Sequence, residues 1–231
     1  MTISDVNKPY NIAKFTADTE LNYVRYPFEI DIFSRYKEAK LLDIKNRLEN
    51  GSYMPGPMNI ANSPKGKSAV RPIPVISFDD QVAYTMVVES IYPEIYQDLV
   101  SLQGVSDFAY QLRSPGKVSW FRHQYNCWDD FKQKSLDQIN NGRQFAVITD
   151  VTGCYENIDV KILLADLRRI GAPADAIAML RKFLKKWSQT GSKGIPQSIA
   201  ASHVLAKIYM SGVDIEMRNA GYKQFRFVDD I

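Results

Sequence analysis

Two adjacent carboxylates, Asp229 and Asp230, directly follow the short strand-like run 225–228. An aromatic-x-Asp-Asp sequence at the tip of a hairpin places like charges side by side, and this raises one pKa unless a cation lies between them. A divalent metal ion removes the conflict, and Mg²⁺ prefers such oxygen ligands while it keeps open positions for phosphate. The sequence at the end of this chain therefore predicts a strand, a tight turn and a site for a metal ion.

The Asp-Asp dipeptide alone is not diagnostic, because it occurs three times in the chain. Asp79-Asp80 and Asp129-Asp130 lie in segments with helical patterns, where we expect solvated side chains. Only Asp229-Asp230 follows a strand-like run, so only this pair is a candidate for catalysis.

A third candidate acid, Asp150, ends the apolar stretch 144–149, which predicts a buried strand. A carboxylate directly after such a strand lies at the end of a sheet, where it can face a cleft. For an isolated acid, a helix N-cap or a turn is the more common role. If Asp150 meets Asp229 through the fold, the acids can hold two ions roughly 4 Å apart, which activate a 3′-hydroxyl and stabilise leaving pyrophosphate.

Between these acids lies Gly194-Ile195-Pro196-Gln197. Proline is favourable near the start of a helix, because its missing N–H would be unsatisfied there in any case. The pattern predicts a helix over 196–217 whose first turn points Gln197 into the cleft beside the metal ions. A plain helix start is the alternative interpretation.

The remaining pattern predicts a mixed α+β chain with a small antiparallel sheet. Strands are expected at 144–150 and 224–228, and loops with short strands across 55–66. Helices are expected at 30–48, at 79–96 with an interruption near Pro93, at 118–140, and at 160–187 with a break at 171–173.

Taken together, these segments resemble the reverse transcriptases. The stretch 145–155 is similar to the family's motif A, 194–202 to motif B, and 227–230 to motif C, in the family's order. The basic stretch 65–73 resembles the fingers segment of intron-type and retron-type enzymes, and Asp80-Gln81-Val82 with Pro93 resembles the helix after it. The resemblance covers the chain from about Ser63 to its end.

The resemblance implies a right-hand polymerase fold. It places an N-terminal extension and the fingers in 1–140 and the palm in 141–231, with 161–193 packing against the fingers. The palm would have an RRM-like antiparallel sheet backed by helices. Because the sequence ends at Ile231, within an expected hairpin, we expect a chain truncated after motif C and lacking the thumb.

The resemblance also implies roles for individual residues. Asp150, Asp229 and Asp230 would be catalytic and hold two Mg²⁺ ions, or Mn²⁺, with the Val151 carbonyl as a further ligand. The implied substrate-binding residues also include Phe227 of motif C and Gln197, which would position the nucleotide or the template.

Tyr155 would lie beneath the incoming sugar and select deoxynucleotides, although an ordinary core aromatic is its plainer interpretation. Lys65 or Lys67, together with Arg71, would grip the triphosphate, because the fork of an arginine fits phosphate oxygens. A solvated run of charge is the plainer interpretation of these three residues.

Two departures from the family pattern stand out. Motif B usually has glycine after its glutamine, whereas this chain has Ser198, and motif C commonly begins with tyrosine, whereas this chain has Phe227. Within the family, the resemblance is to bacterial abortive-infection and antiphage-defence enzymes. It rests on the stretch 201–206, Tyr209, Asp214 and the ending 227–231.

Composition permits this interpretation without demanding it. A formal charge of +3 and a pI near 8.7 allow nucleic-acid binding. Two cysteines and two histidines exclude a disulfide framework and a Cys/His zinc cluster. The N-terminus lacks a signal-peptide pattern and no apolar stretch approaches the roughly 20 residues that span a bilayer, so we expect a cytoplasmic protein without membrane contact.

The leading hypothesis is RNA-templated DNA synthesis, with an RNA template, a DNA or RNA primer and dNTPs as partners, and with a dedicated non-coding RNA or protein as a further partner. An RNA-templated RNA polymerase is the nearest rival, and Tyr155 at the sugar position argues against it. Template-independent or protein-primed DNA synthesis would use the same site. A catalytically silent nucleic-acid-binding module is the alternative from another class, and the retained acids count against it.

Overall fold

The computed structural model describes residues 3, 5–19, 27–65, 69–188 and 192–231, and every structural statement below concerns these residues. The N-terminal part contains α1 (Asn7–Thr19), α2 (Pro27–Arg35), α3 (Lys37–Glu49), β1 (Asn59–Lys65), β2 (Ala69–Val75), α4 (Phe78–Glu89) and α5 (Tyr92–Leu99). The remainder contains α6 (Gln124–Asn140), α7 (Cys154–Asn157), α8 (Val160–Arg169), α9 (Ala174–Trp187) and α10 (Ala200–Asn219).

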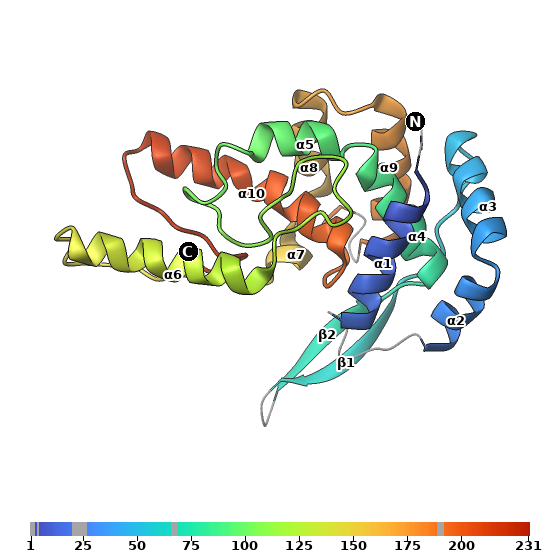
Figure 1. Ribbon diagram of the computed structural model, residues 1–231, viewed down its shortest axis with the longest axis horizontal. Coiled ribbons are helices and arrows are strands. Elements are labelled where there is room, and N and C mark those ends of the chain that lie inside the picture. Colours follow the sequence, from blue (N-terminus) through green and yellow to red (C-terminus); the bar gives the residue numbers. More distant parts are fainter. Residues whose placement is uncertain (1–2, 4, 20–26, 66–68, 189–191) are drawn as a thin grey trace.

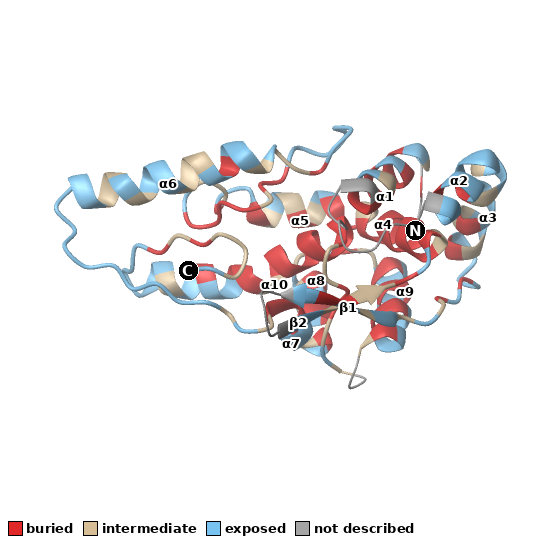
Figure 2. Ribbon diagram, turned by 90° about the horizontal axis from the view of Figure 1, so that it is seen from below, coloured by how far each residue is buried: buried red, intermediate tan, exposed pale blue. Residues whose placement is uncertain are grey.

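The core forms around α4 and α10, which are the most deeply buried helices (Figure 2). Helix α4 carries apolar residues on all sides, a pattern typical of a helix enclosed by other elements. It contacts α1, α3, α9 and α10. The Tyr84 hydroxyl on α4 lies 3.2 Å from the Ser202 hydroxyl on α10, which joins the two central helices directly.

The strands β1 and β2 form a two-stranded antiparallel ribbon that projects from the helical body (Figure 1). Asn59 pairs with Val75 at its base and Lys65 with Ala69 near its tip. Prolines are tolerated here because each strand has an unpaired edge, where a missing N–H costs no ladder bond. Arg71 is thereby carried on an exposed ribbon.

Most of the predicted helices are present. The helix expected at 30–48 is α2 and α3, that at 79–96 is α4 and α5, and that at 160–187 is α8 and α9. The last pair separates where predicted, at Gly171, whose φ of +81° a glycine adopts without strain.

Two predicted helices begin later than expected. Helix α6 begins at Gln124 instead of residue 118, because Phe121 instead pairs with Leu112 in a β-bridge. Helix α10 begins at Ala200 instead of Pro196, because Ser198 has a φ of +64° that no right-handed helix accommodates.

The prediction of a solvated Asp80 is wrong. Its carboxylate is buried and accepts hydrogen bonds from the Tyr53 hydroxyl at 2.9 Å and the Gly56 N–H at 3.0 Å. Burial, followed by the neighbouring Asp80, raises the pKa of Tyr53. Asp80 therefore fastens the loop before β1 to the start of α4.

The prediction of a buried strand at 144–150 is also wrong. Phe145, Val147 and Ile148 are 87–91% exposed, and no backbone hydrogen bond in the described chain joins 144–148 to another segment. An extended segment is buried only where neighbouring strands and helices cover it, and here pairing begins at Thr149. The α+β class holds, but the described sheet is the β1–β2 ribbon, and no RRM-like palm sheet is present among the described residues.

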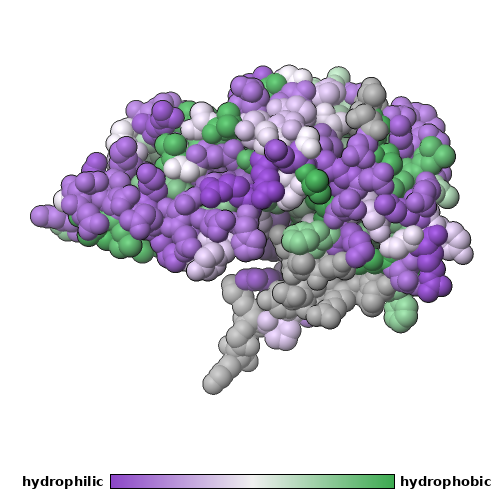
Figure 3. Space-filling model, viewed as in Figure 1, coloured by the Kyte–Doolittle hydropathy of each residue, from purple (hydrophilic) through white to green (hydrophobic). Residues whose placement is uncertain are grey.

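Helix α6 and the segment after it extend away from the helical body as an arm (Figure 1). The arm is mostly hydrophilic on the face seen in Figure 3. The segment near the C-terminus packs against this arm, because the Phe227 ring contacts the rings of Trp128 and Phe131 on α6.

Candidate active site

The fold brings the three candidate acids together, although Asp150 is far from the other two in the sequence. Asp150 and Asp230 form an antiparallel β-bridge. Thr149 and Ile231 exchange both backbone hydrogen bonds at 2.9 Å. The Asp150–Asp230 position is therefore the non-hydrogen-bonded kind of pair, in which opposite side chains come closest.

A tight turn presents Asp229 at its tip. The N–H of Phe227 donates to the Asp230 carbonyl at 2.8 Å, and the N–H of Asp230 donates to the Phe227 carbonyl at 3.2 Å. Inside the turn, Val228 has a φ of +63°, which is strained for a β-branched residue. The N–H of Val151 donates to the Asp229 carbonyl at 3.0 Å, so motif A also contacts the turn.

The pKa of Asp229 reflects the charges gathered at this site. Burial raises the pKa of Asp229, the Asp150 and Asp230 carboxylates raise it further, and Arg71 acts in the opposite direction. Arg71 comes from β2, so the charge that opposes the shift belongs to another element. Burial also raises the pKa of the nearby Cys154 thiol, and Asp229 adds to that effect.

The donor set fits a divalent cation in chemistry and charge. Carboxylates that face each other across a ladder repel, and a cation between them removes the repulsion. Within the described residues, however, no group of three or more His, Cys, Asp or Glu side chains is already arranged around a metal position. Asp150, Asp229 and Asp230 are the residues that would hold such an ion.

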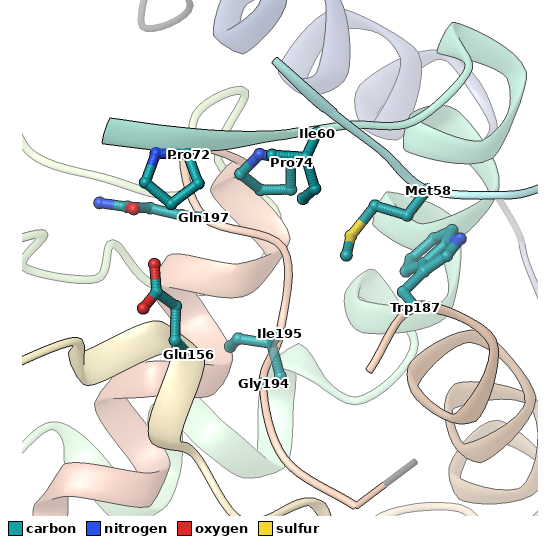
Figure 4. A pocket seen from close by; sticks show the side chains of 9 residues that line it. All are labelled: Met58, Ile60, Pro72, Pro74, Glu156, Trp187, Gly194, Ile195 and Gln197. Atoms are coloured by element: carbon teal, nitrogen blue, oxygen red, sulfur yellow. The ribbon is translucent and has the colours of Figure 1, made fainter. Parts of the chain in front are cut away.

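A pocket is bounded by β2, α7 and the loop before α10 (Figure 4). Gln197 lies against Pro72, and the carboxylate of Glu156 points towards Gln197 (Figure 4). Met58 and Trp187 line its other end. Glu156 was not predicted from the sequence, although its position directly after Tyr155 in the motif A region was a usable signal.

Gly194 fixes the loop that carries Gln197. Its φ is +94°, and its N–H donates to the Ile158 carbonyl at 2.9 Å. The N–H of Ile195 donates to the Tyr155 carbonyl at 3.0 Å. A Cβ atom at position 194 would lie 3.3 Å from the Glu156 carbonyl oxygen, so the close approach of motif B to α7 requires glycine.

Tyr155 on α7 is buried and does not line the Gln197 pocket. Its hydroxyl lies 2.5 Å from Nδ1 of His203, and the His203 ring stacks on Tyr110 at 4.0 Å. Tyr155 and His203 line a second, inner cavity together with Cys154 and Val228. His203 and Tyr110 were missed at the level of sequence, since their contacts join segments far apart in the chain.

The other predicted residues are distributed around the site. The Phe227 ring packs against Trp128 of α6, with centroids 4.9 Å apart. Val151 is half-buried. Lys65 ends β1, but its side chain is outside the described atoms, and Lys67 lies outside the described residues.

Comparison with known proteins identifies the family. The family described as reverse transcriptase (RNA-dependent DNA polymerase) matches residues 63–231, most of the chain. The chain belongs to the reverse transcriptase family. It is 28% identical over 197 residues to the Group II intron-encoded protein LtrA of Lactococcus lactis subsp. cremoris, and equally to the protein of that name from strain MG1363. Each alignment covers 80% of this chain and 29% of the relative, so the chain spans under a third of the relatives' length.

The departure from the family pattern in motif B lies at a residue with a glycine-like backbone conformation. Ser198 occupies the position after the motif B glutamine, and its φ of +64° is one that glycine adopts without strain. The backbone thus keeps a glycine-like conformation although the residue is serine. No helix in the described part of this reverse transcriptase is long and apolar enough to cross a membrane.

Proposed function

We propose that the protein is an RNA-templated DNA polymerase that adds dNTPs to a primer 3′-hydroxyl. The observation that carries this proposal is the meeting of Asp150 with Asp229 and Asp230 at one turn, with Arg71 of the β1–β2 ribbon acting on the same carboxyl. A nucleic-acid-binding module gains nothing from acids gathered where phosphate must approach. The pairing of an acidic cluster with a cation from another element suits nucleotidyl transfer.

In this proposal the primer 3′-hydroxyl gives its proton to water, and its oxygen forms a bond to the α-phosphorus of the dNTP. The bond from that phosphorus to the bridging oxygen breaks, and pyrophosphate leaves. Asp150, Asp229 and Asp230 would hold divalent ions, Mg²⁺ or Mn²⁺, which would neutralise charge and lower the pKa of the attacking hydroxyl. Arg71 binds triphosphate oxygens through its fork, and Lys65 or Lys67 assists it. The Val151 carbonyl is a further proposed metal ligand.

Gln197 and Tyr155 are the proposed selectivity residues. The Gln197 amide can both donate and accept hydrogen bonds, which suits contact with a base or a template nucleotide, and it lines the pocket beside β2. Tyr155 is proposed to limit space at the sugar 2′-position. The contact of its hydroxyl with His203 supports this role, because it keeps the ring in one orientation.

The proposed partners are an RNA template, a DNA or RNA primer and dNTPs, with a dedicated non-coding RNA or protein as a further partner. Helix α9 exposes Arg181, Lys182, Lys185 and Lys186, a basic face that suits a nucleic-acid backbone. The resemblance to antiphage-defence enzymes, carried by 201–206, Tyr209, Asp214 and 227–231, supports a defence role. Both cysteines, Cys127 and Cys154, are free and buried, which is compatible with a reducing cytoplasm.

The test measures incorporation of dNTPs and NTPs on a primed RNA template with Mg²⁺, for the wild type, Asp229→Ala and the control Asp129→Ala. Asp129 forms an exposed ion pair with Lys132 on α6 and is not among the groups that shift the pKa of Asp229. Template-dependent incorporation of dNTPs that only Asp229→Ala abolishes supports the proposal. A preference for NTPs would favour an RNA polymerase, and incorporation without a template would favour template-free synthesis. A folded protein that incorporates no nucleotide would favour a binding module.

A further inference from the structure

A cluster of buried charges lies directly beneath the turn that carries Asp229. Asp107, Lys207, Asp214 and Arg226 expose only 1–3% of their surface. Lys207 and Asp214 come from α10, Asp107 from the loop after α5, and Arg226 from the segment that enters the turn. Two carboxylates balance two cations, so the cluster as a whole carries no net charge.

Arg226 is the member that reaches the turn. Its Nε donates to Asp214 Oδ1 at 3.0 Å, and its Nη2 donates to Asp214 Oδ2 at 2.7 Å. Its Nη1 donates to the carbonyl of Val228 at 2.9 Å. One edge of the guanidinium thus binds Asp214 on α10. Its Nη1 binds the carbonyl of Val228, the strained residue that precedes Asp229.

The backbone of Arg226 is fixed as well. Its N–H donates to the Ser106 carbonyl at 2.7 Å, and its carbonyl accepts from the Phe108 N–H at 2.9 Å. Lys207 differs in this respect, because its ammonium donates to Asp107 and to the Ala109 carbonyl. Arg226 and Lys207 therefore share Asp107, but the hydrogen bond to the turn comes from Arg226.

Stability alone does not explain this cluster. Well-packed apolar residues often stabilise a core as well as a buried ion pair does, but an apolar side chain has no donor for the Val228 carbonyl. Burial acts to lower the pKa of Arg226, yet Asp107 and Asp214 outweigh it and raise that pKa, so the donor stays charged.

We propose that Arg226 is a positioning residue, which orients Asp229 towards Asp150 by holding the Val228 carbonyl from α10. The proposal rests on the function proposed above. It assigns no contact with substrate to Arg226. The Asp214 carboxylate acts indirectly, because it holds the edge of the guanidinium formed by Nε and Nη2.

Arg226→Lys tests the proposal, because lysine keeps the charge but cannot bind Asp214 through a fork and reach Val228 at the same time. Lys207→Met is the matched control, since it disturbs the same cluster without removing a bond to the turn. Three quantities are measured for each: urea stability, hydrogen exchange of the peptide 224–231 without metal, and kcat, KM and divalent-ion requirement for dNTP incorporation.

We expect Arg226→Lys to speed exchange of the turn amides by about tenfold and to lower kcat by about 100-fold, the scale of a 1 Å misplacement. KM for dNTP should change little, and half-maximal activity should need more divalent ion. Lys207→Met should lose at least as much stability, yet keep turn exchange and kcat close to wild type.

Equal effects of the two variants at equal loss of stability would overturn the proposal, as would unchanged turn exchange in Arg226→Lys. If Arg226→Lys does not fold, Asp214→Asn replaces it, because that change loosens the guanidinium while its bond to Val228 remains possible. Hydrogen exchange requires no activity. An inactive wild type would therefore contradict the proposed function and still leave the role of Arg226 to be decided by exchange.

Discussion

Asp150 and Asp230 lie directly opposite each other in an antiparallel bridge, at the kind of position where facing side chains come closest. Like charges at such a position destabilise the pairing of the two strands. The backbone bonds on either side, between Thr149 and Ile231 and from Val151 to Asp229, nevertheless hold the strands together. The pairing therefore maintains an electrostatic conflict that a bound cation would remove.

The first prediction concerns Asp150. Replacing Asp150 with Asn removes a charge from the site while keeping the size of the side chain, so dNTP incorporation should fall by about 100-fold or more, the scale for losing one electrostatic contact to the transition state. Asp159→Asn is the control, because Asp159 caps α8 and asparagine caps equally well. Comparable activity of the two variants in a primer-extension assay would contradict the role of Asp150.

The second prediction is that Asp229→Asn stabilises the metal-free protein. The pKa of Asp229 is raised by burial and by its acidic neighbours, so the folded protein binds this proton more tightly than the unfolded chain does. Above the raised pKa the charged carboxylate lowers the free energy of unfolding, and below about pH 3.9 this penalty is absent, because the group is protonated in both states.

In thermal melts with a chelator, Asp229→Asn should therefore melt above the wild type at pH 7, and the difference should shrink as the pH falls. Added Mg²⁺ should raise the melting temperature of the wild type more than that of the variant. A variant that melts below the wild type at pH 7 would show that the carboxylate is stabilised by a partner instead of being strained.

The sequence was sufficient to predict features that depend on neighbouring residues. The break between α8 and α9 follows from Gly171, and the end of α3 follows from Asn50 and Gly51. Family-like motifs also predicted that Asp150 would meet Asp229, although nothing in the local pattern around either acid requires it.

The features that were missed depend on partners distant in the sequence. The burial of Asp80 requires Tyr53 and Gly56, and the role of Arg226 requires Asp214 on another element. The exposed segment 144–148 shows the converse error, because an apolar run predicts burial only if other strands cover it. Long-range pairing decides such features, and composition and periodicity carry no record of it.

The third prediction concerns the strain at Val228, whose φ is +63°. Comparing Val228→Gly with Val228→Ala removes the contribution of the valine side chain from both variants. The glycine variant should be more stable than the alanine variant by about 1 kcal/mol, because an L-residue pays for the left-handed conformation and glycine does not. Chemical denaturation measures the difference, and the usual order, with alanine the more stable, would contradict the strained turn.

The fourth prediction concerns Gly194. Gly194→Ala should lower the free energy of unfolding by about 1–3 kcal/mol, because its φ is +94° and a Cβ atom would press on the Glu156 carbonyl. Gly212→Ala on α10 is the control: no atom lies within 4 Å of that Cβ, and alanine should stabilise the helix by up to about 1 kcal/mol. Urea titration of both variants tests the opposite signs.

The last prediction separates the ring of Tyr155 from its hydroxyl. If the ring limits space at the sugar, Tyr155→Phe should keep the preference for dNTPs over NTPs, whereas Tyr155→Val should reduce it. The hydroxyl contact with His203 orients the ring, so His203→Phe should weaken the preference less than Tyr155→Val does. The measurement is the ratio of kcat/KM for a dNTP and the matching NTP. Equal loss of dNTP and NTP incorporation in Tyr155→Val, with the ratio unchanged, would identify Tyr155 as a core aromatic that supports α7 and plays no part in sugar selection.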